Sequence, residues 1–517
     1  MSPAWKRALL VIGSTAAVVA VVAIVFLLRA GNAGAANWPV NWELRSSDNG
    51  TLFEVIRDAV EGRALDWSFS PQVFVFPELP ISTLAYAITG GSIYGYYVAV
   101  AGINGALLFL ALVLLVRSIW RDAGLNAWLI RAGVAMLPLV LLPLIGTSWL
   151  VSFHLAPTYY FGMYLALIGA PALFFAERRL SRVLIGSALA LTVASNPLTL
   201  VFAGPAFAVV LIVVLAGRGW RGIRRPLLTF VAVVLVAVAV RLAVFTPLQG
   251  TSPLTYIDPE VFAGRLAGFR MYFAYLATDS STLVILVIGG ACALGGVVAA
   301  VVACVRFLRG SGSPRLLIAV YLGLVPVLGI AGTYLLMITH YLYTWPLFIA
   351  PTVFALLLVP TSWGQRVLAL SPVLFLVIAL ATGSVTAIGH PERYFGYRNA
   401  ETVCIDDSVP PGTIAGYATF SDSRRLSLTS ARGIDLVPLE TDATPSTWLT
   451  NRAYPRELPG SFFYINGAGD ELAIDASLVA TRFGDADQRV DCSDSQYLMI
   501  YTDPQKLTLI AAYYGSR

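Results

Sequence analysis

Charge is scarce in this sequence: of 517 residues, only 12% are Asp, Glu, Lys or Arg, whereas 57% are hydrophobic. Soluble proteins usually carry about 25% charged residues, so this composition excludes a water-soluble enzyme. Lysine is almost absent, because Lys6 and Lys506 are the only lysines among 34 basic residues. Such a preference for arginine is typical of a GC-rich genome and leads us to expect a bacterial protein.

Cysteine is also scarce, with four residues and no Cys-x-x-Cys pair. Without ligand spacing of this kind we expect no metal site and no cofactor, although nothing in the sequence excludes a divalent ion. Cys404 and Cys492 lie in the C-terminal part of the chain, and we predict that they form a disulfide in an oxidising compartment. The sequence shows no nucleotide fold, phosphate loop or nucleophile elbow.

The few charges are unevenly distributed. Residues 391–517 hold 17 acidic and 11 basic residues, whereas residues 1–390 hold 12 acidic and 23 basic ones. The net charge of +5 is therefore the sum of a basic N-terminal part and an acidic C-terminal part. It indicates no single basic surface, and we expect no nucleic-acid partner.

Long apolar runs are abundant. A helix needs about 20 apolar residues to cross the hydrocarbon layer, because lipid offers no partner for a backbone amide. We predict an all-α membrane domain over residues 1–390 with eleven passes: 8–29, 93–116, 125–148, 158–176, 180–195, 198–216, 226–246, 281–305, 316–338, 342–360 and 367–388.

The arginines collect in alternate loops, which places those loops and the N-terminus in the cytoplasm. We therefore expect a multi-pass protein of the bacterial plasma membrane, with a retained first pass and two large outer loops at 30–92 and 247–280. Residues 391–517 are predicted to form an extracytoplasmic α/β domain that is accessory, as a lid or a platform. Its expected strands are 413–419, 425–429, 435–439, 461–465 and 496–501.

The first outer loop contains a helical pattern from Thr51 to Gly62. Its apolar residues share one face, so we expect an amphipathic helix lying in the membrane interface. Thr51 and Glu54 have capping-box spacing, and Glu54 and Asp58 are expected on the solvated face. Asp48 would then lie immediately before the helix, just above the bilayer.

Three short segments resemble those of membrane glycosyltransferases of the GT-C superfamily, which include protein O-mannosyltransferases, aminoarabinose transferases and actinobacterial arabinosyl- and mannosyltransferases. Asp48-Asn49-Gly50 follows the first pass as the family's acidic motif does, with Asn49 in place of a second acid. Phe74–Pro80 is similar to the family's proline-containing entry to a second juxtamembrane helix. His340–Pro346 is similar to the aromatic start of a late pass.

This resemblance implies transfer of a sugar from a polyprenyl phosphate to an extracytoplasmic acceptor glycan, lipid or protein, usually with inversion. A carboxylate takes the proton of the acceptor hydroxyl, and cationic side chains hold the lipid phosphate. Asp48 is the candidate base; its alternative role is a helix cap.

The other candidates are weighed against ordinary roles at a membrane surface. Arg241, Arg265 and Arg270 are candidates for the donor phosphate, and snorkelling to headgroups is their alternative. His154, His340, Tyr341 and Asn196 are candidates for sugar or acceptor contacts, with a helix-ending role as the alternative for Asn196. We expect Asp48, the three arginines and His340 to line one outward-facing cavity.

Two other functions fit the same composition. The protein would be a non-catalytic membrane scaffold or assembly partner of an envelope-polymer pathway, or a ligase or flippase of a lipid-linked polymer. The first would use residues 391–517 for binding. A secondary transporter is disfavoured because no repeated halves are evident.

Overall fold

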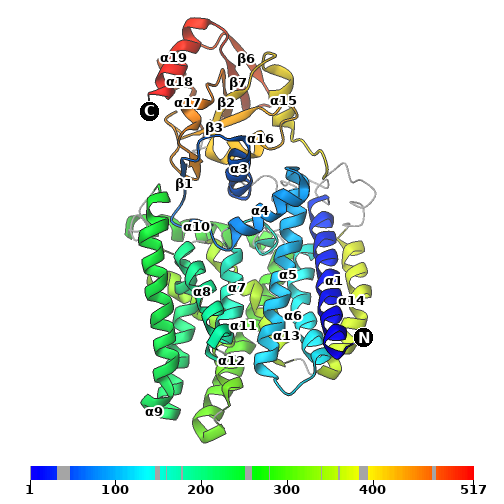
Figure 1. The fold of residues 1–517 in the computed structure, drawn as a ribbon. Helices are drawn as coiled ribbons and strands as arrows, with labels where there is room; N and C mark the ends of the chain where they lie inside the picture. Colours follow the sequence, from blue (N-terminus) through cyan, green and yellow to red (C-terminus); the bar gives the residue numbers. More distant parts are fainter. Residues whose placement is uncertain are drawn as a thin grey trace.

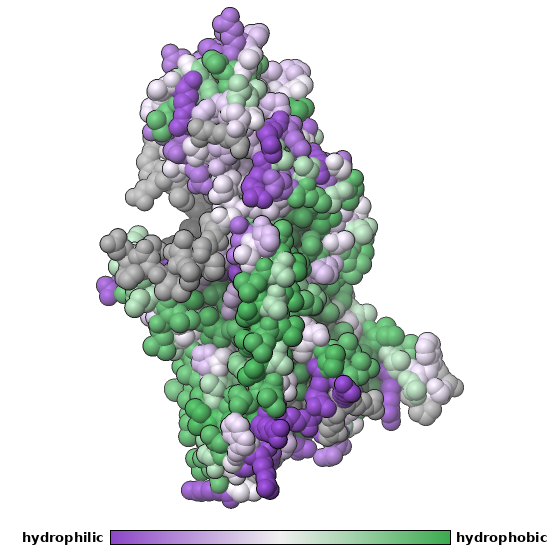
Figure 2. All heavy atoms as spheres, turned by 60° about the vertical axis from the view of Figure 1, so that its left-hand side comes forward, coloured by the Kyte–Doolittle hydropathy of each residue, from purple (hydrophilic) through white to green (hydrophobic). Residues whose placement is uncertain are grey.

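The computed structural model describes the chain except residues 1, 32–46, 146–151, 159, 176–178, 251–258, 279, 312, 339–340, 359–360, 383–393, 468–472 and 517. A bundle of long apolar helices forms one part, and a small domain containing a sheet lies at one end of it (Figure 1). Apolar side chains cover the sides of the bundle, whereas polar ones cover the small domain and the opposite end (Figure 2).

Each of the eleven predicted passes coincides with a helix. The bundle consists of α1 (Pro3–Gly31), α5 (Ile93–Ile119), α6 (Leu125–Ile145), α7 (Phe161–Phe175), α8 (Arg179–Ser195), α9 (Leu198–Val240), α11 (Ser280–Arg306), α12 (Pro314–Leu335), α13 (Pro346–Leu358) and α14 (Thr361–Ala381). In the described residues, seven helical segments are long and apolar enough to cross a membrane. The number of eleven passes and their direction stay predictions.

One of the seven segments holds two of the predicted passes. α9 continues through a π-helical turn, η2 (Arg241–Phe245), into a short 3-10 turn, η3 (Thr246–Leu248). Its geometry is broken at Gly219, where φ is +64°, a value that glycine adopts readily. The second half of α9 runs beside α8. Arg182 of α8 and Leu228 of α9 line one groove, and Arg241, directly after α9, donates to the Ala194 carbonyl of α8.

Three helices at the end of the bundle nearest the small domain do not belong to the predicted passes. They are α3 (Ser47–Glu61), α4 (Glu78–Thr89) and α10 (Pro259–Thr278) (Figure 1). α4 begins at Glu78, whose Oε1 accepts a hydrogen bond of 2.8 Å from the Gly162 amide at the start of α7. This carboxylate therefore ties the first outer loop to the bundle.

The small domain contains a five-stranded mixed sheet in the order β3-β2-β5-β7-β6. β2 (Ala415–Thr419) lies parallel to β3 (Asp435–Leu439) and β5 (Phe462–Asn466), whereas β7 (Gln496–Ile500) is antiparallel to β5 and β6 (Gln488–Asp491). The predicted strand at 425–429 is wrong, because these residues belong to α16 (Phe420–Ser427) and the turn after it. The other helices are α15 (Ala400–Ser408), α17 (Tyr454–Glu457), α18 (Ala476–Phe483) and α19 (Pro504–Gly515).

The small domain is joined to the first outer loop by a shared core and a shared strand pair. β1 (Trp67–Ser68) pairs antiparallel with β4 (Thr450–Asn451). Leu52, Trp67 and Phe74 from the loop belong to one buried apolar cluster with residues of the sheet and of α8. Burial of such side chains stabilises their association by about 1.5–3 kcal/mol each, so the domain is docked onto the loop.

The predicted disulfide is confirmed: Cys404 of α15 is bonded to Cys492, 88 residues away, beside the edge strand β6. Replacing both cysteines with serine should destabilise the small domain by about 2–4 kcal/mol, because the unfolded chain regains the freedom that the crosslink removes. The effect is measured by heating the detergent-solubilised full chain and recording, at each temperature, the extent of trypsin cleavage within residues 394–516. The double variant Cys292→Ser/Cys304→Ser, at the free cysteines of α11, is the control and should leave the cleavage midpoint unchanged.

Candidate functional site

Helix α3 begins four residues earlier than its sequence pattern predicts. Ser47 starts it, and the Ser47 hydroxyl donates a hydrogen bond of 2.8 Å to the Ser421 carbonyl of the small domain. The predicted capping box is wrong, because the Thr51 hydroxyl donates to the Ser47 carbonyl inside the helix. The predicted end is confirmed, since Gly62 has a φ of +73°. Asp48 therefore lies in the first turn of the helix, not before it.

Both faces of α3 are buried, which corrects the expectation of a helix with one solvated face. Leu52 and Ile56 of the apolar face are buried, and so are Glu54 and Asp58, with 4% and 0% of their surfaces exposed. α4 packs against α3, and so does α16 of the small domain. The polar face of α3 is thus covered by the small domain.

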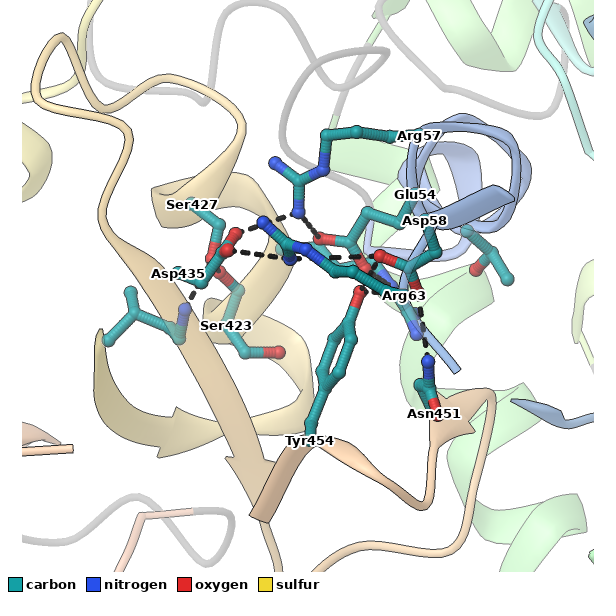
Figure 3. Close-up of polar contacts among 12 residues, drawn as sticks. Glu54, Arg57, Asp58, Arg63, Ser423, Ser427, Asp435, Asn451 and Tyr454 are labelled. Atoms are coloured by element: carbon teal, nitrogen blue, oxygen red, sulfur yellow. Dashed lines mark hydrogen bonds and ion pairs between the residues drawn. The ribbon is translucent and has the colours of Figure 1, made fainter. Parts of the chain in front are cut away.

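Charged side chains fill the contact between α3 and the small domain (Figure 3). The Arg424 Nε donates to Glu54 Oε2 at 2.8 Å, and both side chains are almost fully buried. Arg57 and Arg63 donate to the two carboxylate oxygens of Asp435 at 2.7 and 2.9 Å. Buried charges are tolerated only when they are paired in this way. We call this set, with Asp58, the α3 ion cluster.

Asp58 is the second acidic residue of the cluster on α3. Its carboxylate accepts hydrogen bonds from Trp67 Nε1 at 3.0 Å, Asn451 Nδ2 at 2.9 Å and the Tyr454 hydroxyl at 2.9 Å. Trp67 belongs to the loop, whereas Asn451 and Tyr454 belong to the small domain. Asp58 therefore connects α3 to both. Its role in this geometry is structural.

Asp48 lies at the edge of the same contact and is half-buried. Burial raises the pKa of Asp48 to about 6, and the nearby Arg424 guanidinium opposes this rise. Gly50, two residues later, allows α16 to approach closely, because a Cβ there would lie 2.5 Å from Leu428 Cδ1. The Asp48-Asn49-Gly50 motif is therefore covered by Arg424 and Leu428 of the small domain. A carboxylate with a pKa near neutral is suited to take up a proton.

No family model and no curated protein matches the chain. Among solved structures, it is similar to the crystal structure of the oligosaccharyltransferase of Archaeoglobus fulgidus in complex with Zn and sulfate, with 13% sequence identity and a TM-score of 0.46. The match covers 86% of this chain and 67% of that chain. Function is therefore argued below from the side chains of this protein.

Arg241 and Asn196 lie together around the end of α8. The Arg241 guanidinium donates to the Ala194 carbonyl at 2.9 Å and to the Pro71 carbonyl at 3.0 Å. Asn196 is buried; its Oδ1 accepts from the Leu198 amide at the start of α9, as the helix-ending alternative predicts. Ser195, the last residue of α8, accepts hydrogen bonds from the Val75 and Phe76 amides through its hydroxyl. These residues hold the proline- and aromatic-rich segment of the outer loop against the bundle.

His154 is buried in the connection between α6 and α7. Its Nε2 lies 2.7 Å from the Leu139 carbonyl, and its ring packs beside that of Tyr164. Burial lowers the pKa of His154 to about 4, so the ring is neutral at physiological pH. The structure thus places His154 within the packed core, away from Asp48 at the contact with the small domain.

The remaining candidates belong to the second outer loop and the start of α13. Arg265 and Arg270 lie on α10, where Arg265 is half-buried and Arg270 is exposed. Tyr341 begins η6 (Tyr341–Thr344), a short helix in contact with α10. His340 lies outside the described residues. The described candidates therefore lie in four places: Asp48 at the contact with the small domain, Arg241 and Asn196 around the end of α8, His154 in the core, and Arg265 and Arg270 on α10 with Tyr341 in the neighbouring η6.

Sequence reasoning did not identify Arg424, Asp435, Asn451 and Tyr454 as partners of the first outer loop. The available signal was charge complementarity between Glu54, Arg57 and Asp58 on one helix and the Arg424-Arg425 pair of the small domain. No group of three or more potential metal ligands occurs among the described residues. The arrangement offers one titratable carboxylate beside a fixed cation.

Replacing Arg424 with glutamine should weaken the docking of the small domain by about 3–5 kcal/mol, because Glu54 would be left buried without its partner. Arg452→Gln is the matched control, since its pair with Asp66 is largely exposed and such pairs contribute less than about 1 kcal/mol. Thermal unfolding and the rate of trypsin cleavage between α14 and α15 report the difference. Equal stability of the two variants would contradict the importance of the buried pair.

Proposed function

We propose that this protein is a membrane glycosyltransferase that moves a sugar from a polyprenyl-phosphate donor to an extracytoplasmic acceptor, with Asp48 as the general base. Asp48 Oδ takes the proton of the acceptor hydroxyl while that oxygen attacks the anomeric carbon. The bond from this carbon to the phosphate oxygen breaks, and the lipid phosphate leaves with the bonding electrons. Attack from the face opposite the phosphate inverts the anomeric configuration.

The observation that carries this proposal is the environment of Asp48. The first turn of α3 presents a half-buried carboxylate with a raised pKa, close to the bundle of apolar helices. Glu54, six residues later, is paired with Arg424, and Asp58 accepts hydrogen bonds from three donors. Among the described acids of α3 in this contact, Asp48 alone makes no hydrogen bond or ion pair through its side chain. It is therefore the one suited to exchange protons.

The donor phosphate requires cationic side chains at the membrane surface. α10 lies across the same end of the bundle as α3 and α4 (Figure 1) and carries Arg265 and Arg270. We therefore assign the phosphate to Arg265 and Arg270. Arg241 binds two backbone carbonyls, and we assign to it the positioning of the loop around Pro71. Sugar contacts would come from His340 and from Tyr341 of η6.

The small domain would form one wall of the acceptor site. Arg424 and Leu428 lie over the motif that contains Asp48, so an acceptor that reaches Asp48 passes along α16. This arrangement favours catalysis over the scaffold function, because a domain used only to recruit partners has no need to cover the motif.

Asp48→Asn should abolish transfer from a radiolabelled polyprenyl-phosphate sugar, because the amide cannot accept the hydroxyl proton. Loss of a general base typically costs about 10²–10⁴-fold in rate. Product formation by purified protein with a panel of donor sugars measures the effect. Asp66→Asn is the control: it removes a largely exposed carboxylate from the same loop and should leave transfer unchanged.

Thermal unfolding of both variants shows whether the fold is kept. Undiminished transfer by folded Asp48→Asn would exclude Asp48 as the base. Absence of transfer by the wild-type protein with every donor would instead favour the scaffold, ligase or flippase functions.

The transfer rate should also depend on pH through Asp48. Its pKa in the folded protein is about 6, and only the ionised form is a base, so kcat/KM should be constant above pH 7. Below pH 6 it should fall about tenfold per unit, because the fraction of ionised carboxylate falls by that factor. A phosphodiester donor stays ionised over this range and contributes no titration. A profile that is flat from pH 5 to 8 would contradict this assignment.

A further inference from the structure

A groove of about 690 Å³ lies at the end of the bundle opposite the small domain. It is bordered by the first turns of α1, the last turn of α5 and the start of α6. Arg7, Arg117 and Arg121 line it together with the apolar side chains of Val11, Ile12, Leu125 and Trp128. This site is distant from Asp48 along the bundle axis and has no part in the proposed transfer reaction.

The polar wall of this groove is held in place by a hydrogen bond and a cation–π contact of Trp128. Trp128 Nε1 donates to the Trp120 carbonyl at 2.7 Å, which fixes the indole. Arg117 lies 5.5 Å from the centre of the Trp128 ring. Contact with a ring face still leaves a guanidinium its N–H donors for an anion. The groove therefore has a preformed cationic wall.

The lining of the groove carries basic but no acidic side chains among the described residues. The acid next in sequence, Asp122, has 94% of its side chain exposed and pairs with Arg315 at 3.1 Å, outside the groove. The guanidinium groups of Arg7 and Arg117 thus border a cavity whose described lining holds no carboxylate.

The other wall of the groove is apolar. Val11 and Ile12 belong to α1, and Leu125 begins α6, so the apolar wall is continuous with the sides of helices that are long enough to cross a membrane. A ligand that fits both walls has an anionic head and hydrocarbon chains. A free anion would leave the apolar wall uncovered, and a nucleotide would place its polar base and ribose against it.

We propose that the groove between α1, α5 and α6 binds the phosphate headgroup of an anionic glycerophospholipid, with its acyl chains along α1 and α6. Basic pockets between membrane helices bind such headgroups by charge and hydrogen bonding. The lipid fills the space between the first helix and its neighbours. It thereby holds α1, from which the first outer loop emerges, against the bundle.

The test compares Arg7→Gln/Arg117→Gln with a control of equal charge change, Arg221→Gln/Arg224→Gln. The control residues are exposed, belong to the arginine-rich segment of α9 and do not line the groove. Purified protein is titrated with dioleoyl-phosphatidylglycerol, with dioleoyl-phosphatidylcholine and with inorganic phosphate. Native mass spectrometry counts the bound lipids, and thermal unfolding reports stabilisation.

We expect the wild-type and control proteins to retain one more phosphatidylglycerol than the groove variant does. Affinity at this site should fall about 30-fold in the variant, as the loss of two juxtamembrane arginines implies. Phosphatidylcholine and inorganic phosphate should give no comparable stabilisation.

Equal loss of lipid from both double variants would overturn the proposal, because binding would then reflect charge alone. Equal stabilisation by inorganic phosphate would also overturn it, since the apolar wall would contribute nothing. The single variant Arg117→Gln provides a second measurement should the double variant fold poorly, and it should lose the same lipid.

Discussion

The arrangement of the outer part of this protein depends on one buried ion pair, between Glu54 of α3 and Arg424 of α16. Removing two charges from water costs several kcal/mol per ion, and the attraction between them offsets this only when the geometry is good and the remaining donors are satisfied. Here the Arg424 Nε donates to Glu54 at 2.8 Å, while a second nitrogen donates to the Ser47 carbonyl. The neighbouring arginines of α3 and its end, Arg57 and Arg63, share the carboxylate of Asp435, and Arg63 also pairs with Glu61 of its own segment. Because Glu54 and Arg424 lie on opposite segments, separation of the helix from the small domain would leave both charges without this partner.

This pairing also explains the environment of Asp48. Burial raises the pKa of Asp48 to about 6, and the Arg424 guanidinium opposes this rise. The Arg424 Nε donates to Glu54 and not to Asp48, so Arg424 acts on Asp48 through its charge. The contact that buries α3 against α16 thus both desolvates Asp48 and places a cation near it, and these two opposing effects set the pKa on which the proposed reaction depends.

The sequence predicts the parts of this protein that depend on local pattern. Every expected pass coincides with a helix, because mean hydropathy over about 20 residues is set by residues adjacent in the chain. Gly62 ends α3 as expected, because a left-handed residue after a helix is a local requirement. The errors arise where distant residues decide. Glu54 and Arg424 are 370 positions apart, and nothing near Glu54 shows that its face of the helix is buried. The start of α3 was misplaced for the same reason, since Ser47 is held by Ser421 of the small domain. The position of Asp48 could be predicted, whereas its burial and its cationic neighbour could not.

The small domain shows why net charge is a poor guide to how a domain docks. Its excess of acidic residues suits solubility outside the membrane, and its lack of a catalytic motif predicts only an accessory role. The face it turns toward α3, however, presents Arg424 to Glu54, and it accepts Arg57 and Arg63 through a single carboxylate, Asp435. What matters at a contact is the sign of each charge opposite its partner, not the sum over the domain. The other acidic side chains of the domain are either exposed, as Asp491 is, or buried beside an arginine, as Asp406 and Asp422 are. Because the Glu54–Arg424 pair and the register of β1 with β4 fix which residues meet, the domain covers the Asp48 motif in one defined orientation, and the proposed acceptor would have to reach that motif along α16.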